Sequence, residues 1–292
     1  MPTIRERFEA VWLPLPVWRR LDAYVLLAAG YTAGVEVATR ESGVEMPRWI
    51  GDMAVVNGII LGVLLGFRNR EAYERWWEAR KLWGGLINDS RNLCLKAVAL
   101  ADPDPDDRRR LGRLVAGFAL ALKRHLRGGG RLRDVPGFGD DPADPAHVPA
   151  HLAGRVLALL KDWRRAGRLS DLDALTLDPH ARALMDVCGA CERIKSSPVP
   201  LSYRAMLRHG TLLYLITAPW FFGGVYGYWA VAVVALLAYF LIGIELTAED
   251  VEEPFGKDGD DLPLGRFCDT VRRSAEEILG VDLGPGDPRK AV

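Results

Sequence analysis

The chain has 292 residues, which allows one large domain or two ordinary ones. Its formal net charge is zero although 26% of its residues are charged, and this excludes a nucleic-acid-binding protein that relies on overall positive charge. The charge is strongly segregated along the chain. Almost no charged residue falls within four windows, residues 23–38, 53–67, 210–224 and 228–246.

These four windows predict transmembrane helices. A helix needs about 20 residues to cross the hydrocarbon core, so the shorter windows must borrow flanking residues. We expect spans at 21–38, 50–67, 208–224 and 228–246, the last two joined by an aromatic-rich turn of the kind found at membrane interfaces. Residues 1–20 lack an apolar core followed by a cleavage site, so we expect the first span to serve as an uncleaved insertion signal.

The second window carries two stripes at helical spacing. Gly58, Gly62 and Gly66 recur every fourth residue, and small residues at this spacing let membrane helices approach closely. Ile59, Val63 and Phe67 form a second stripe about 100° further round. Either the glycines pack on neighbouring helices and the second stripe faces a pore axis, or the helix is buried and its glycines pack within its own chain.

Arginine and lysine residues near the helix ends predict the orientation. Before the first span and after the second they are frequent, whereas the 39–52 loop holds two arginines and the 225–227 turn none. We therefore expect a multi-pass protein of the inner (plasma) membrane with both termini in the cytoplasm. The regions 68–207 and 247–283 would be cytoplasmic.

The cytoplasmic region reads as helical. We expect residues 68–100 to continue the second span, with further helices over 106–127, 151–166, 179–195 and 266–279. Residues 128–149 are rich in Gly, Pro and Asp and predict a loop, and residues 284–292 predict a disordered tail. No strand-like alternation occurs, so the expected class is all-α.

Catalytic motifs are not evident in the sequence. There is no Ser-His-Asp arrangement, phosphate-binding glycine loop or zinc-protease motif, and the five histidines are scattered. Cys188 and Cys191 have the spacing of a redox or metal pair, but no second pair and no β-α-β pattern accompany them. Buried helix residues are the simpler interpretation.

Five short segments, in this order around four apolar windows, resemble the bestrophin family, particularly its bacterial members. They are FRNREAYERWWEAR (67–80), CERI (191–194), PVPLSY (198–203), EPFG (253–256) and DDLP (260–263). The resemblance implies a pentameric ion channel in which each subunit lends its second membrane helix to a central pore.

The resemblance also implies particular site residues. The family's narrow neck is made of three apolar residues spaced by four, which fall on Ile59, Val63 and Phe67. A second, cytoplasmic constriction would lie near Leu172, with Leu169 as the competing position. Animal relatives bind calcium after the Pro-Phe-Gly turn, where Asp258 and Asp261 match but Lys257 and Gly259 replace acidic residues. We expect no resident cofactor, with calcium a weaker alternative.

The leading hypothesis is therefore a homopentameric channel in the lipid bilayer that conducts chloride or other monovalent ions, without enzymatic activity and without nucleic acid as a partner. Arg68, directly after the neck, is a candidate for setting ion selectivity, or else it bridges neighbouring helices and never meets the ion. A membrane-anchored cytoplasmic redox protein using Cys188 and Cys191 is the alternative. A helical scaffold with a basic partner-binding face is a third possibility.

Overall fold

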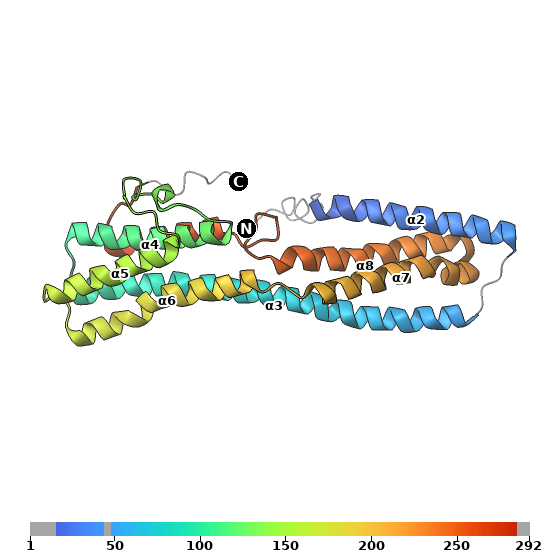
Figure 1. Cartoon of the computed structure of the whole chain (residues 1–292), viewed down its shortest axis with the longest axis horizontal. Helices are drawn as coiled ribbons and strands as arrows, with labels where there is room; N and C mark the ends of the chain where they lie inside the picture. Colours follow the sequence, from blue (N-terminus) through green and yellow to red (C-terminus); the bar gives the residue numbers. More distant parts are fainter. Residues whose placement is uncertain (1–15, 44–47, 285–292) are drawn as a thin grey trace. The chain divides into compact units, whose positions relative to one another are not determined.

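The protein is described here by a computed structural model, which covers residues 16–43 and 48–284. Every regular element in this described part is helical, which confirms the predicted all-α class. The chain divides into two compact units, each assembled from two separate stretches (Figure 1). Unit 1 takes Met1–Glu74 and Val199–Glu252, and unit 2 takes Arg75–Pro198 and Glu253–Val292.

Unit 1 contains the apolar windows. Its helices are α2 (Pro16–Ser42), the first part of α3 (Arg48–Ala101), α7 (Leu201–Tyr226) and α8 (Ala230–Glu252). The helices α2, α7 and α8 pack side by side, and α3 joins them by burying Ala54 and Leu61 against Tyr214 of α7 (Figure 1). The prediction that the second window continues unbroken into the charged segment is confirmed, since α3 is a single helix. It has no interior proline that would stop it.

Within residues 16–43 and 48–284, three helical segments are long and apolar enough to cross a membrane: Arg20–Ser42, Gly51–Ala101 and Leu201–Glu252. The third segment contains both α7 and α8, which are separated by the short 3₁₀ turn η2 (Gly227–Trp229). Gly227 has a φ of 55°, a left-handed conformation that glycine adopts without steric cost, and this allows the chain to reverse. The first three predicted spans fall within α2, α3 and α7, and the fourth, 228–246, begins in η2 and continues in α8.

Unit 2 is a helical bundle with its own apolar core. It consists of the second part of α3 with α4 (Pro105–Leu126), α5 (Val148–Arg165), α6 (Asp171–Ser196) and α9 (Leu264–Leu279). Fully buried side chains from each helix meet in one cluster, including Trp83, Phe118, Val156, Leu184 and Val271. The predicted 128–149 loop holds one short 3₁₀ turn, η1 (Leu132–Asp134).

The largest difference from the sequence prediction is the start of α6. We expected this helix from residue 179 because proline favours the first turn of a helix. Instead, Ser170 caps the helix by accepting the backbone N–H of Asp173, whose carboxylate accepts the Ser170 N–H in return. Pro179 therefore lies inside α6. The predictions for residues 1–15 and for the tail beyond Gly284 lie outside the described residues.

Candidate functional site

The exposed face of α3 in unit 1 is apolar. Ile59, Val63 and Phe67 are 64%, 54% and 56% exposed. Residues two positions apart on a helix point about 200° apart, so Leu61 and Leu65, which are 2% exposed, face the opposite side, toward the rest of unit 1. The predicted neck stripe thus lies on the side of α3 that the described part of the chain leaves exposed.

The three glycines of α3 have different surroundings. A Cβ atom added at Gly58 would lie 3.2 Å from the Tyr214 hydroxyl oxygen, so this glycine packs within its own chain. At Gly62 and Gly66 an added Cβ would meet nothing within 4 Å among the described residues. The glycine stripe is therefore divided: its first member packs on α7, and the other two leave a shallow surface.

Arg68 lies on the buried side of α3 rather than beside the exposed stripe. Its side chain is fully buried, and its Nη2 lies 2.6 Å from Oε2 of Glu252 on α8. The other Glu252 oxygen accepts the backbone N–H of Val199 at 2.7 Å. This arrangement favours the alternative in which the arginine bridges helices of its own chain. The neighbouring pair Arg70–Glu74, by contrast, is exposed, with Nε and Oε1 2.7 Å apart.

The two candidates for a cytoplasmic constriction differ sharply in exposure. Leu172, in the first turn of α6, is 73% exposed, whereas Leu169 is 3% exposed and belongs to the core of unit 2. Only an exposed side chain can line a constriction without unfolding the core. The structure therefore favours Leu172 over Leu169 for this role.

The two predicted calcium ligands lie in the loop between α8 and α9. The Asp261 carboxylate accepts the backbone N–H of Asp258 and lies against Gly256, so it already organises the turn. Burial raises the pKa of Asp261, which disfavours its charged form. Calcium prefers six to eight oxygen ligands, and this loop offers two carboxylates at the matching positions. Calcium binding stays a prediction from the resemblance.

The cysteine pair on α6 does not form the exposed dithiol that the redox hypothesis requires. Cys188 and Cys191 are free, and both are fully buried in the core of unit 2. Burial raises the pKa of each thiol to about 12, and the nearby Glu192 carboxylate adds to the effect. Thiols in this state are poor nucleophiles at neutral pH, which argues against the redox alternative.

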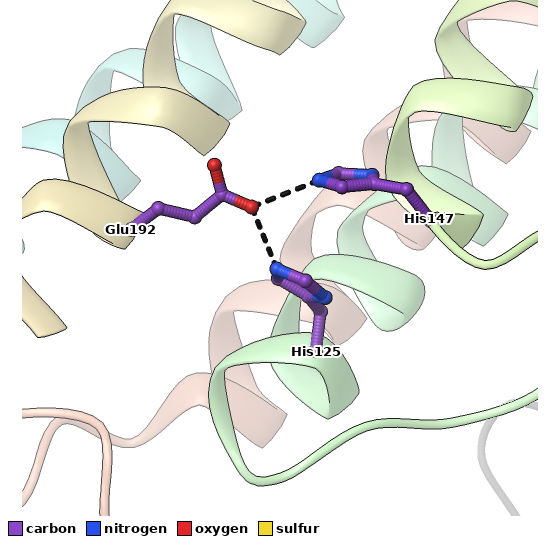
Figure 2. A group of neighbouring side chains, drawn as sticks. All are labelled: His125, His147 and Glu192. Atoms are coloured by element: carbon purple, nitrogen blue, oxygen red, sulfur yellow. Dashed lines mark hydrogen bonds and ion pairs between the residues drawn. The ribbon is translucent and has the colours of Figure 1, made fainter. Parts of the chain in front are cut away.

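Sequence reasoning missed one cluster, in unit 2. His125 in the last turn of α4 and His147 at the N-cap of α5 both point to the carboxylate of Glu192 on α6 (Figure 2). Their Nε2 atoms lie 2.6 Å and 2.8 Å from the same oxygen, Oε1. Because the histidines are 67 and 45 positions from Glu192, no sequence motif could indicate the cluster.

Comparisons with known proteins agree with this fold. Residues 15–277 match the family described as bacterial/fungal bestrophin protein. A voltage-dependent anion channel-forming protein of Synechocystis is 34% identical over 236 residues, which cover 77% of this chain and 76% of the relative. The voltage-dependent anion channel-forming protein YneE of Escherichia coli K12 is 32% identical over 219 residues, covering 73% and 72%.

The fold itself is similar to a solved structure. The crystal structure of a bacterial bestrophin homologue from Klebsiella pneumoniae superposes with a TM-score of 0.79 at 25% identity, covering 89% of this chain and 98% of that one. The sequence segments from Phe67 to Pro263, the helical architecture and these matches all agree. The chain belongs to the bacterial and fungal bestrophin family.

Proposed function

We propose that this protein is a homopentameric ion channel of the inner (plasma) membrane, with α3 of each subunit lining a central pore. The observation that carries the proposal is the apolar stripe of Ile59, Val63 and Phe67 on α3, which the chain leaves exposed opposite its buried face. In a symmetric assembly, five copies of this stripe would form three stacked apolar rings. The open surface at Gly62 and Gly66 leaves room for a neighbouring helix to approach beside them.

Apolar rings of this kind would gate by dewetting. A narrow apolar passage holds water poorly, so ions that keep their hydration shell meet a barrier without any physical plug. Leu172, exposed at the start of α6, is the residue proposed for a second constriction on the cytoplasmic side. The distribution of arginine and lysine supports an orientation with both termini in the cytoplasm.

Small anions are the proposed permeant ions. The relatives in Synechocystis and Escherichia coli are named voltage-dependent anion channel-forming proteins, and this chain is similar to them over about three quarters of its length. Chloride is the simplest member of this class, and other monovalent ions are the alternative. The same relatives and the family argue for a channel rather than an enzyme.

Flux through reconstituted vesicles tests the proposal. Purified protein in liposomes should conduct chloride, and replacing chloride with a large organic anion should reduce the flux more than replacing sodium does. Ile59→Ala, Val63→Ala and Phe67→Ala should each raise conductance severalfold, because a smaller side chain widens or wets the ring. Leu26→Ala is the matched control, since Leu26 is an exposed apolar residue of α2 in the same unit.

Three outcomes would contradict parts of the proposal. Unchanged flux in all three single variants and in the triple variant would remove these residues from the pore. A fully assembled protein that carried sodium as readily as chloride would remove the anion preference and keep the pore. An oligomer other than a pentamer, measured by native mass spectrometry, would contradict the proposed symmetry.

A further inference from the structure

The cluster of His125, His147 and Glu192 has no part in the proposed pore. It brings together two imidazole nitrogens and one carboxylate oxygen, all within 4.8 Å of one another, from three separate elements of unit 2. Among the described residues, no other group of three His, Cys, Asp or Glu side chains has this spacing. Each of the three side chains is about one third exposed, so an ion can reach them from water.

We propose that these three residues form a binding site for a divalent transition-metal ion of the zinc class. Zinc lies about 2.0–2.2 Å from nitrogen and oxygen ligands, so tetrahedral ligands are roughly 3.3–3.5 Å apart. The Nε2 atoms lie 2.6 Å and 2.8 Å from Glu192 Oε1, so each of these two separations need lengthen by less than about 1 Å. A water molecule would complete the coordination on the exposed side.

The ligand types favour zinc-class metals over calcium and magnesium. Imidazole nitrogen binds zinc, copper and nickel well, whereas calcium and magnesium take oxygen ligands almost entirely. The site would be distinct from the predicted calcium loop, because Asp258 and Asp261 lie between α8 and α9 and are not in this ligand group.

Neighbouring groups hold the ligands in place. Glu192 lies on α6 one turn after the fully buried Cys188, so the core of unit 2 fixes the helix from which its carboxylate projects. His125 lies in the last turn of α4, where the negative end of the helix dipole favours a cation. Lys195 opposes this effect to some extent, because its ammonium group donates to the backbone carbonyl of His125 at 3.3 Å.

Metal binding would replace the hydrogen bonds of both histidines to Glu192 and would also change a third hydrogen bond, at the N-cap of α5. The Nδ1 atom of His147 accepts the backbone N–H of Ala150 at 3.0 Å, so in the metal-free protein the ring proton sits on Nε2 and points at Glu192. To bind a metal through Nε2, the ring must carry its proton on Nδ1, which cannot accept from Ala150. The metal therefore replaces an existing hydrogen-bonded state, and its removal leaves a folded protein.

Zinc titration of the full-length purified protein, after treatment with EDTA, tests the site without any need for channel activity. Equilibrium dialysis with elemental analysis should find one zinc ion per chain. Glu192→Gln, His125→Ala and His147→Ala should each weaken binding by more than about 100-fold, because even outer partners of a metal site contribute 10–100-fold. Glu192→Gln retains hydrogen-bonding capacity, which protects the fold.

His180→Gln is the matched control. His180 also pairs with a carboxylate in unit 2, with its Nδ1 2.8 Å from Asp89, but it lacks a second histidine. The His180→Gln variant should bind zinc as tightly as the wild type does. A second measurement uses Co²⁺ as the probe. The wild type should give the intense visible bands of tetrahedral cobalt without a thiolate charge-transfer band, because the buried Cys188 and Cys191 are not in the ligand group.

Two results would overturn the proposal. If the wild type bound no more zinc than Glu192→Gln, and both eluted as the same oligomer, the cluster would be no more than a hydrogen-bonded contact. Equal loss in His180→Gln would show that zinc binds elsewhere. Because these measurements read metal content, a protein that failed to conduct chloride could still pass them.

Discussion

The Arg68–Glu252 ion pair is buried inside unit 1. Neither residue is more than 2% exposed, and the Nε and Nη1 atoms of Arg68 have no hydrogen-bond partner among the described residues. Removing one partner of a buried pair leaves an uncompensated charge, which is far more costly than losing a surface pair. Arg68 directly follows Phe67 in the sequence, but its side chain lies on the buried side of α3, where it pairs with Glu252.

Glu252→Ala should therefore lower the free energy of unfolding by about 3–5 kcal/mol. Replacing both partners together, in Arg68→Met with Glu252→Leu, should recover much of that loss. Thermal unfolding of the detergent-solubilised protein measures both effects. Glu74→Ala is the control, since it breaks the exposed pair with Arg70 and should leave the melting temperature almost unchanged. Equal losses at Glu252 and Glu74 would contradict a buried role for the pair.

The buried cysteines of α6 make a different prediction. Replacing both Cys188 and Cys191 with serine should lower the melting temperature, because each hydroxyl enters an apolar core. Ion selectivity and sensitivity to mild oxidants should not change, because the thiols are inaccessible and protonated. Loss of wild-type conduction on treatment with an oxidant, reversed by a reductant, would restore the redox hypothesis.

At the scale of the element, α3 shows what could and could not be predicted from the sequence. Its length and its two stripes follow from residue spacing, which the helix preserves. Spacing alone cannot say which face packs inside the chain, because that depends on α7 and α8. The start of α6 was missed for a local reason: Pro179 is a strong signal for a first turn, but the capping pair of Ser170 and Asp173 lies earlier.

The divided glycine stripe allows assembly to be separated from folding. Gly62→Leu should leave the subunit folded, because its side chain would enter open space, yet it should break or loosen the oligomer by holding subunits apart. Gly58→Leu should instead destabilise the subunit, since Tyr214 occupies the space its side chain needs. Native mass spectrometry and thermal unfolding distinguish these effects. A wild-type oligomer with Gly62→Leu would mean that this glycine faces lipid.

For the whole molecule, the core of unit 2 depends on a helix remote in sequence from most of its partners. Val271 of α9 is 1% exposed within the cluster that α3 to α6 supply. Val271→Asp should prevent this core from forming, because a carboxylate would be buried without a partner. The expected result is aggregation on size-exclusion chromatography. Arg273→Asp, a charge change at an exposed position of the same helix, should elute normally.

The division of each unit into two stretches of sequence has a consequence for biosynthesis. At 5–20 residues per second, a ribosome needs roughly 6–25 s to make Arg75–Pro198, the stretch that separates the first part of α3 from α7. During that time Glu36 of α2, which lies against Gly223 of α7 in the finished fold, has no partner helix. The nascent α2 and the first part of α3 must therefore stay in the insertion machinery, or beside it, until α7 and α8 are synthesised. Variants that slow translation within this stretch would then lower the yield of inserted protein while leaving every contact of the folded chain unchanged.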